Sequence, residues 1–276
     1  MLTTLLPWGA LVANPILEGL ELQPFPPDSQ WRLYSDLAWL WPIISPPADH
    51  IRKNKQFSEM IQAQCPGGVR TLLHLGCGGG HDDFTLKRHF EVTGVDVSAA
   101  MLELARRLNP EVDYHLGDMR TVRLEKTFDS VIIGDSSNYM LTREDLLAAF
   151  RTAFVHLRPG GILLTMAEET SDSFQQDKTL CSTHVQGDVE VTFVQNYYDP
   201  DPRDTTYEVT LLFLVRRHGQ LAIGVDRHKL GLFGLDTWRE ILGEAGFTVK
   251  QAELRVWDVE ERIYPVLVGT KARVSD

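Results

Sequence analysis

Residues 74–80 read His-Leu-Gly-Cys-Gly-Gly-Gly, and this stretch decides the fold of the chain. An apolar run at residues 69–75 leads into it and is typical of a buried strand, while residues 81–89 after it have the pattern of a helix. Glycines at such a junction let the backbone approach a ligand closely and take conformations that a Cβ forbids. The start of the following helix adds N–H donors and positive potential. The stretch therefore predicts a ligand-binding loop beyond the carboxyl end of a strand in an open α/β sheet.

Strand and helix patterns alternate regularly around this loop. The predicted strands are residues 69–75, 91–95, 112–116, 128–133 and 162–166. The predicted helices are residues 49–64, 81–89, 98–108 and 143–157. Ser98 is placed to cap the third of these helices, and an Arg-Pro-Gly-Gly turn at residues 158–161 precedes the fifth strand. Strands that alternate with helices predict a mainly parallel sheet with helices on both faces.

The pattern changes after residue 169. Extended segments without intervening helices, at residues 189–197, 206–217 and 221–233, predict antiparallel strands. A helix at residues 235–245 and strands at residues 248–257 and 262–270 are then expected. We therefore expect four parts: an N-terminal helical arm and cap (1–68), an α/β core (69–170), an antiparallel β insertion on the substrate side (171–232), and a C-terminal helix and strands that complete the core sheet (233–276).

Composition excludes several classes of protein. The chain has 276 residues, 43% of them hydrophobic, and its net charge of −11 argues against nonspecific binding to nucleic acid or anionic lipid. Cys65, Cys77 and Cys181 are too few and too scattered for a disulfide framework or a zinc site, so no metal is expected. The apolar stretch at residues 1–22 is interrupted by prolines and is expected to form a surface arm. A cytoplasmic monomer or homodimer is the resulting expectation.

The spacing of the glycines separates two kinds of nucleotide site. The dinucleotide fingerprint has glycine at its first, third and sixth positions, but the sixth position here is His81. The loop instead reads G-x-G-x-G, which resembles motif I of the class I S-adenosylmethionine-dependent methyltransferases. The resemblance continues through Asp96 at the end of the second strand, residues 117–119 after the third, residues 128–133, and the turn before the fifth strand. It implies a Rossmann-like, seven-stranded α/β fold with the antiparallel insertion over the active site.

The resemblance also implies a cofactor site. Asp96 is in the position that binds the ribose hydroxyls, and its carboxylate can accept from two donors. Residues 33–38 resemble the N-terminal helix of the family, whose tyrosine (here Tyr34) closes over the methionine end; a core or rim aromatic is the equally favoured alternative. The residues implied to contact S-adenosylmethionine are Tyr34, His74, Gly76, Cys77, Gly78, Gly80, Asp96, Val97, Met101, Asp118, Met119 and Asp135.

Three of the polar positions carry a second interpretation. Many relatives have an acid at the position of His74, and that acid orients the glycine loop or the methionine amine. A protonated His74 would repel this amine, so its contact with the cofactor is in doubt. Asp118 follows a strand and could make only an Asx-turn. Asp129, at the beginning of the fourth strand, is expected to serve the fold.

The acceptor side is less clearly marked. Residues 135–138 read Asp-Ser-Ser-Asn and lack the prolines of the enzymes that methylate amino groups of DNA bases. This segment and the insertion resemble small-molecule N-methyltransferases, including glycine N-methyltransferase and the aminosugar N,N-dimethyltransferases. The resemblance implies a small-molecule acceptor with an amine, although the sequence does not decide between methylation of nitrogen and of oxygen. His228 is expected to be a packed histidine, and no general base is identified. Candidates for the acceptor pocket are Tyr139, Tyr197, Tyr198 and His184.

Two alternatives remain open at this point. An NAD(P)-dependent oxidoreductase has the same architecture, although the glycine spacing and the pair Gly117 and Asp118 argue against it. A non-catalytic protein that keeps the fold and binds the cofactor is the other alternative, and His74 is its best support.

Overall fold

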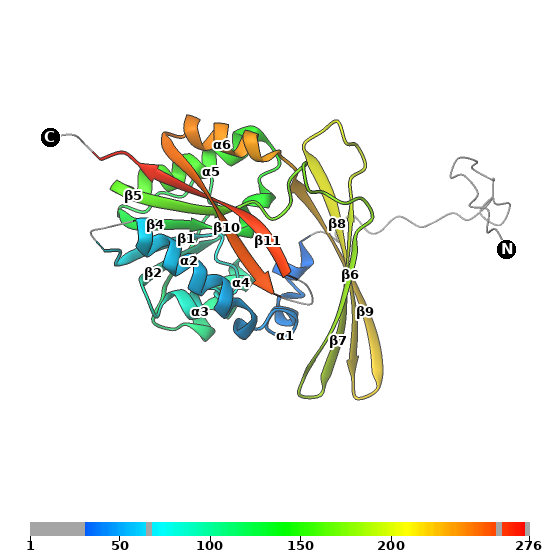
Figure 1. The fold of residues 1–276 in the computed structure, drawn as a ribbon. Helices are drawn as coiled ribbons and strands as arrows, with labels where there is room; N and C mark the ends of the chain where they lie inside the picture. The colour runs from blue at the N-terminus through cyan, green and yellow to red at the C-terminus, as the bar shows by residue number, and fades with distance from the viewer. Residues whose placement is uncertain (1–30, 65–67, 258–260, 274–276) are drawn as a thin grey trace.

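The computed structural model describes residues 31–64, 68–257 and 261–273, which form two sheets (Figure 1). The expected surface arm at residues 1–22 lies outside the described residues. The larger sheet has seven strands, and one of them, β11 (Glu261–Lys271), runs antiparallel to both of its neighbours. Its order is β10 (Phe247–Trp257), β11 (Glu261–Lys271), β5 (Leu157–Met166), β4 (Phe128–Ile133), β1 (Thr71–Leu75), β2 (Glu91–Asp96) and β3 (Asp113–Leu116). The predicted mainly parallel seven-stranded α/β fold is confirmed.

Helices cover both faces of this sheet (Figure 1). On one face lie α2 (Ile51–Gln64), α3 (Asp83–Leu86) and α4 (Ala99–Leu108). On the other face lie α5 (Arg143–His156) and α6 (Leu235–Glu244). The alternation of β1 explains the two cores, because Leu73 and Leu75 pack with α5 and α6 while Leu72 packs with α2 and α4.

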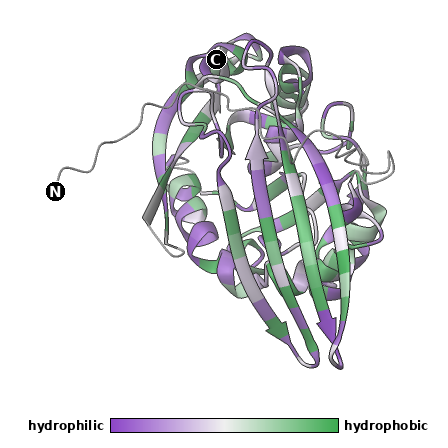
Figure 2. Ribbon diagram, turned by 90° about the vertical axis from the view of Figure 1, so that its right-hand side faces the viewer, coloured by the Kyte–Doolittle hydropathy of each residue, from purple (hydrophilic) through white to green (hydrophobic). Residues whose placement is uncertain are grey.

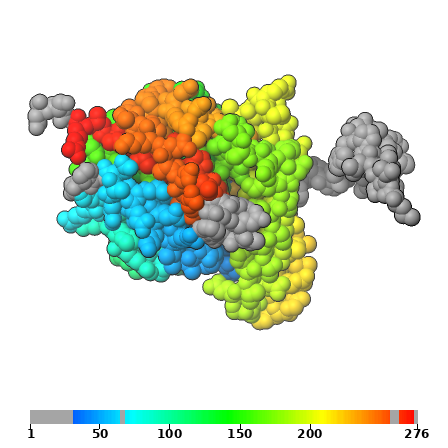
Figure 3. All heavy atoms as spheres, viewed as in Figure 1, coloured from blue at the N-terminus to red at the C-terminus, as the bar shows by residue number. Residues whose placement is uncertain are grey.

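Short helices before α2 join the core to the second sheet. They are η1 (Arg32–Tyr34), η2 (Ala38–Leu40), α1 (Trp41–Ile44) and η3 (Pro47–His50). The prolines at positions 42, 46 and 47 predict a turn-rich connection without a helix, and this prediction is wrong for α1. Pro42 lies in its first turn, where a missing N–H costs nothing. In the space-filling view these blue residues lie between the cyan core and the yellow-green strands (Figure 3).

The second sheet contains four antiparallel strands and stands beside the core (Figure 1). Its strands, in order, are β6 (Thr179–Gln186), β7 (Val189–Tyr198), β8 (Thr206–Arg217) and β9 (Gln220–Gly231). All four fall within the expected insertion, but β6 was not predicted. Hydrophilic and hydrophobic residues alternate along the strands (Figure 2). The inner face, with Val209, Leu211 and Phe213, packs on Leu33 and Leu40 of the N-terminal segment.

Two local predictions differ from the structure. The expected turn at residues 158–161 is part of β5, whose pairing with β4 shifts register between Phe128 and Ser130. Gly160 there has φ of +79°, and a Cβ on Gly161 would lie 2.9 Å from a backbone oxygen. The expected helix at residues 81–89 contains only the single turn of α3, because backbone hydrogen bonds of the 3₁₀ and turn type follow it.

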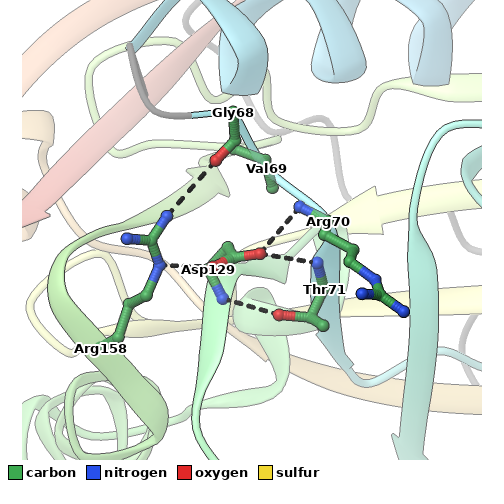
Figure 4. A pocket seen from close by; sticks show the side chains of 6 residues that line it. All are labelled: Gly68, Val69, Arg70, Thr71, Asp129 and Arg158. Atoms are coloured by element: carbon green, nitrogen blue, oxygen red, sulfur yellow. Dashed lines mark hydrogen bonds and ion pairs between the residues drawn. The ribbon is translucent and has the colours of Figure 1, made fainter.

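Asp129 lies at the amino-terminal end of β4, in a surface hollow away from the glycine loop (Figure 4). Its carboxylate accepts hydrogen bonds from the backbone N–H groups of Arg70 and Thr71, both at 2.8 Å, and pairs with Arg158. Burial opposes the charge of Asp129, but these hydrogen bonds and Arg158 outweigh it and hold its pKa below the ordinary value. The prediction that Asp129 serves the fold is confirmed.

Candidate cofactor and acceptor site

The glycine loop is fastened to the end of β2. The N–H groups of Gly76 and Cys77 both donate to the carbonyl of Val95, at 2.8 and 3.0 Å. Gly76, Gly78 and Gly80 have φ of +75°, +52° and +72°, a region that disfavours residues with a Cβ. The glycines are therefore needed for the path of the loop itself, whatever it binds.

Open space lies beside this loop. A Cβ built on Gly78 meets no atom within 4 Å, and the same is true of Gly134, which follows β4 and is itself buried. A Cβ on Gly76, by contrast, would collide with Ser136. Gly78 and Gly134 each leave one side of the backbone uncovered, and both follow the carboxyl ends of parallel strands, the edge where ligands bind in open α/β sheets.

Asp96 closes β2 at the edge of this space. One carboxylate oxygen accepts from the N–H of Gly78 and the other from the N–H of Ser98, each at 2.8 Å. Burial raises the pKa of Asp96 above its ordinary value. Each oxygen keeps a lone pair for a further donor, as binding of two ribose hydroxyls requires. Two exposed apolar side chains, Val97 (74%) and Leu116 (63%), end β2 and β3 nearby and offer a surface for a planar base.

His74 does not face this space. Its Nδ1 lies 2.7 Å from a carboxylate oxygen of Asp83, and both side chains are buried. Burial favours the neutral imidazole, but Asp83 outweighs it and raises the pKa of His74. The Tyr114 hydroxyl donates to the second oxygen of Asp83 at 2.9 Å, and Asn109 bonds both Tyr114 and the carbonyl of Gly80. Asp83 therefore holds the imidazole of His74 in place, and the network reaches the glycine loop through Asn109 and the carbonyl of Gly80.

Tyr34 belongs to a 3₁₀ turn and not to the helix that the resemblance implied. The hydroxyl of Ser98 donates to the carbonyl of Tyr34 at 2.6 Å, so the cap of α4 holds the N-terminal segment. Trp41 of α1 lies against the glycine loop, since a Cβ on Gly79 would be 2.9 Å from its ring. The segment thus covers the loop and brings Tyr34 near Asp96, which acts electrostatically on its phenol.

Tyr34 starts a chain of hydrogen bonds between three elements. Its hydroxyl lies 2.7 Å from that of Tyr139 in η4 (Asp135–Tyr139), which lies 2.8 Å from Nδ1 of His228 on β9. Nε2 of His228 lies 2.8 Å from Asp226 on the same strand. His228 is buried, as expected of a packed histidine, but both of its ring nitrogens are engaged. The ring of Trp31 stacks on His228 with centroids 5.2 Å apart.

The other acceptor candidates are placed differently. Tyr197 lies on the inner face of the second sheet, stacked on Tyr207 at 6.2 Å, with the ammonium of Lys178 over its ring. Tyr198 is 44% exposed, because neighbouring residues of a strand point to opposite faces. His184 is on the edge strand β6, where Nε2 lies 2.8 Å from the hydroxyl of Ser182. Of the four candidates, the structure brings Tyr139 into contact with Tyr34.

Four of the predicted cofactor residues have partners of their own. Asp118 accepts from the backbone N–H of Arg120 and pairs with its guanidinium, which matches the Asx-turn alternative. Met119 packs partly on the core near Gly76. The side chains of Met101 and Cys77 are buried, at 1% and 5% exposure, and the backbone N–H and carbonyl of Cys77 are bonded to Val95 and Gly80.

Acidic side chains gather at the ends of β4 and β5, and the sequence analysis missed one of them. Asp135 is exposed just after β4, and Glu168 is half-buried just after β5. Burial, followed by repulsion from Asp135 and Glu169, raises the pKa of Glu168 to about 7. Glu169 itself forms an ion pair with Lys178. The position of Glu168 beyond a predicted parallel strand was the signal that could have identified it.

Within residues 31–64, 68–257 and 261–273, no group of three His, Cys, Asp or Glu side chains is arranged to hold a metal ion. None of the helices in these ranges is both long and apolar enough to cross a membrane.

Comparisons with known proteins point to the same kind of site as this geometry. A family model described as a methyltransferase domain matches residues 72–161. A “Putative methyltransferase” of Geobacillus sp. (strain WCH70) is 30% identical over 198 residues, 66% of this chain and 75% of that protein. The dTDP-3-amino-3,4,6-trideoxy-alpha-D-glucopyranose N,N-dimethyltransferase of Streptomyces venezuelae is 32% identical over 118 residues, 42% of this chain and 49% of that protein.

The same fold is present in a solved structure. The crystal structure of Streptomyces venezuelae DesVI superposes with a TM-score of 0.74 and 22% identity, covering 86% of this chain and 96% of that one. The glycine loop, the acid that ends β2 and the family match agree, and none of them supports the nicotinamide alternative. This chain belongs to the class I S-adenosylmethionine-dependent methyltransferases.

Proposed function

We propose that this protein transfers the methyl group of S-adenosylmethionine to an amino group of a small molecule, with amino sugars and their nucleotide conjugates as the first class to test. The observation that carries the proposal is the pair Asp135 and Glu168 beside the open space, with the phenol of Tyr34 in their electrostatic reach. Partial burial and repulsion from Asp135 and Glu169 raise the pKa of Glu168, and the negative charge at this edge favours a cationic or basic acceptor. The name of the Streptomyces venezuelae relative supports an amine.

The cofactor site follows from the open space beside the loop. We propose that the backbone of Gly76, Cys77 and Gly78 lines the methionine part, that Asp96 accepts from the ribose hydroxyls, and that Val97 and Leu116 flank the adenine. Gly80 and His74 support the site indirectly, Gly80 through its hydrogen bond from Asn109 and His74 through its contact with Asp83. Tyr34, Asp118, Met119 and Asp135 border the same edge of the sheet, whereas Met101 supports it from the core.

The chemistry needs a positioned lone pair and a place for one proton. When bound, the cofactor supplies an electrophilic methyl group on a cationic sulfur. The acceptor nitrogen forms the new N–C bond while the C–S bond breaks, with its electron pair going to sulfur. A neutral amine thereby becomes a charged one, and carboxylates at this edge stabilise that charge as it develops. Exclusion of water by Trp41 and Tyr34 strengthens the effect.

The test separates cofactor binding from methyl transfer. Calorimetry with S-adenosylhomocysteine and NAD identifies the cofactor, and mass spectrometry follows methylation of matched acceptors that carry either an amino or a hydroxyl group. We expect saturable binding of S-adenosylhomocysteine and methylation of the amino member of each pair. Methylation of the hydroxyl member alone contradicts the amine proposal. Cofactor binding without methylation of any acceptor would favour the non-catalytic alternative.

A further inference from the structure

When His228 is neutral, the hydrogen bonds from Tyr34 to Asp226 have only one consistent direction. An ionised carboxylate accepts only, so Nε2 of His228 carries a proton and donates to Asp226. In the neutral imidazole, Nδ1 is then an acceptor and takes the hydroxyl proton of Tyr139. The Tyr139 oxygen in turn accepts from the hydroxyl of Tyr34. The phenol oxygen of Tyr34 is thus left with its lone pairs available to a donor.

Charges within the chain support this direction. Burial opposes ionisation of Asp226, but the hydrogen bonds from His228 and from the N–H of Leu33 outweigh it and lower the pKa of Asp226. Burial raises the pKa of both phenols, Tyr34 and Tyr139, well above the ordinary value. Neither phenol holds a negative charge at neutral pH, so a proton delivered to Tyr34 has to move onward.

Building on the proposed amine methylation, we propose that the oxygen of Tyr34 accepts a proton from the acceptor amine and that Tyr139 passes a proton on to His228. The N–H bond of the amine breaks and a bond to the Tyr34 oxygen forms, while the Tyr34 proton moves to Tyr139 and the Tyr139 proton to Nδ1 of His228. One proton leaves the amine, one arrives on the imidazole, and no electrons are exchanged. Tyr34 is the catalytic residue, and Tyr139, His228 and Asp226 act through it.

The residues around His228 stabilise the imidazolium that forms when this side chain receives the proton. Asp226 lies on one side of His228, and the stacked ring of Trp31 offers its face to the cation. Among the ionisable groups that act on Tyr34 from other elements are carboxylates at the ends of β2, β4 and β5, and Tyr207 acts on Tyr139 from β8. The carboxylates are Asp96, Asp135 and Glu168. Negative charge therefore faces the end that receives the proton, and it draws a cationic amine towards Tyr34.

The test compares two acceptors that differ in basicity. One is an alkyl amine that is protonated at the assay pH, and the other is its analogue with fluorine beside the amino group, which is neutral there. The variants are Tyr139→Phe, His228→Gln and Glu168→Gln. His218→Gln is the matched control, since His218 is an exposed residue in the turn between β8 and β9. Affinity for S-adenosylhomocysteine and the thermal midpoint report whether each variant is folded.

We expect Tyr139→Phe and His228→Gln to lower kcat for the alkyl amine by about 100-fold and to change kcat for the fluorinated analogue by less than about threefold. The loss for the alkyl amine should shrink as the pH is raised towards the pKa of that amine. Equal losses with both acceptors overturn the relay and leave the proposed function standing. The relay is also overturned if Glu168→Gln alone shows the dependence on basicity. If the wild-type protein methylates neither amine, both proposals fail.

Discussion

The hydroxyl of Ser98 donates to the carbonyl of Tyr34 at 2.6 Å, and this bond joins the N-terminal segment to the first turn of α4. The same hydroxyl accepts from the N–H of Met101 as the helix cap, and the N–H of Ser98 donates to Asp96 at 2.8 Å. Ser98 therefore holds both Asp96, which is proposed to bind the ribose, and Tyr34, which is proposed to meet the acceptor. A change in the cofactor contact of Asp96 can alter the position of Tyr34 through Ser98.

Ser98→Ala should destabilise the protein by about 1 kcal/mol through loss of the cap, and it should also release the carbonyl of Tyr34. The second effect predicts a fall in kcat that exceeds the change in cofactor affinity. Ser98→Thr is the control, because threonine keeps a hydroxyl that can both cap and donate. Denaturant titration and steady-state kinetics measure the two effects. A kcat of Ser98→Ala equal to that of the threonine variant would show that the Tyr34 contact is dispensable.

Asp96→Asn should weaken binding of S-adenosylhomocysteine by about 1–3 kcal/mol, because a charge-assisted contact becomes a neutral one. The amide also keeps only one acceptor oxygen for the N–H groups of Gly78 and Ser98. Asp113→Asn, an exposed carboxylate on β3 that pairs with His115, is the matched control and should bind normally. Calorimetry decides the question, and an unchanged affinity in the Asp96 variant means that the ribose is held elsewhere.

Gly80→Ala should destabilise the protein more than Gly187→Ala. Both glycines have positive φ, +72° and +61°, so both substitutions cost about 1–2 kcal/mol in backbone strain. A Cβ on Gly80 would also lie 2.7 Å from Asn109 and from the hydroxyl of Tyr114, whereas a Cβ on Gly187 meets nothing within 4 Å. The collision should add about 1–3 kcal/mol. Chemical denaturation of both variants measures the difference, and equal values would mean that the buried network yields freely.

The order of the elements was predictable because each strand of the core is marked by its own apolar run and ends at a recognisable loop. Ser98 illustrates this, since its capping role follows from local sequence and is observed. The edge strand β6 was missed for a physical reason. Five of its eight residues are polar and three of these are consecutive, at 182–184, so its sequence lacks a strict apolar–polar alternation although its side chains do alternate in burial.

The acceptor side was less predictable because its contacts depend on tertiary structure. Tyr139 and His228 are 89 residues apart, and they meet only because the second sheet presents β9 to η4. Nothing in the spacing of these residues indicates that pairing. The contact of Asp83 with His74 was hidden in the same way, since the two side chains meet only because the fold buries them together.

Glu168 gives a prediction of stability against pH. Its carboxyl has a pKa of about 7 in the folded protein and 4.5 as the ordinary value, so folding favours the protonated form. The resulting stabilisation is fully present below pH 4.5 and is lost as the pH rises through about 7, because the unfolded chain releases this proton first. Glu168→Gln cannot ionise and should be more stable than the wild type at pH 8 by about 2–3 kcal/mol. The advantage should shrink steadily towards pH 5.

Urea titrations from pH 5 to pH 8 measure the free energy of unfolding of each variant. Glu125→Gln, at an exposed position, is the control, and its stability should change with pH as that of the wild type does. If the stability of wild type and of Glu168→Gln changes with pH in the same way, the Glu168 carboxylate is well solvated and the negative environment proposed for the acceptor is contradicted.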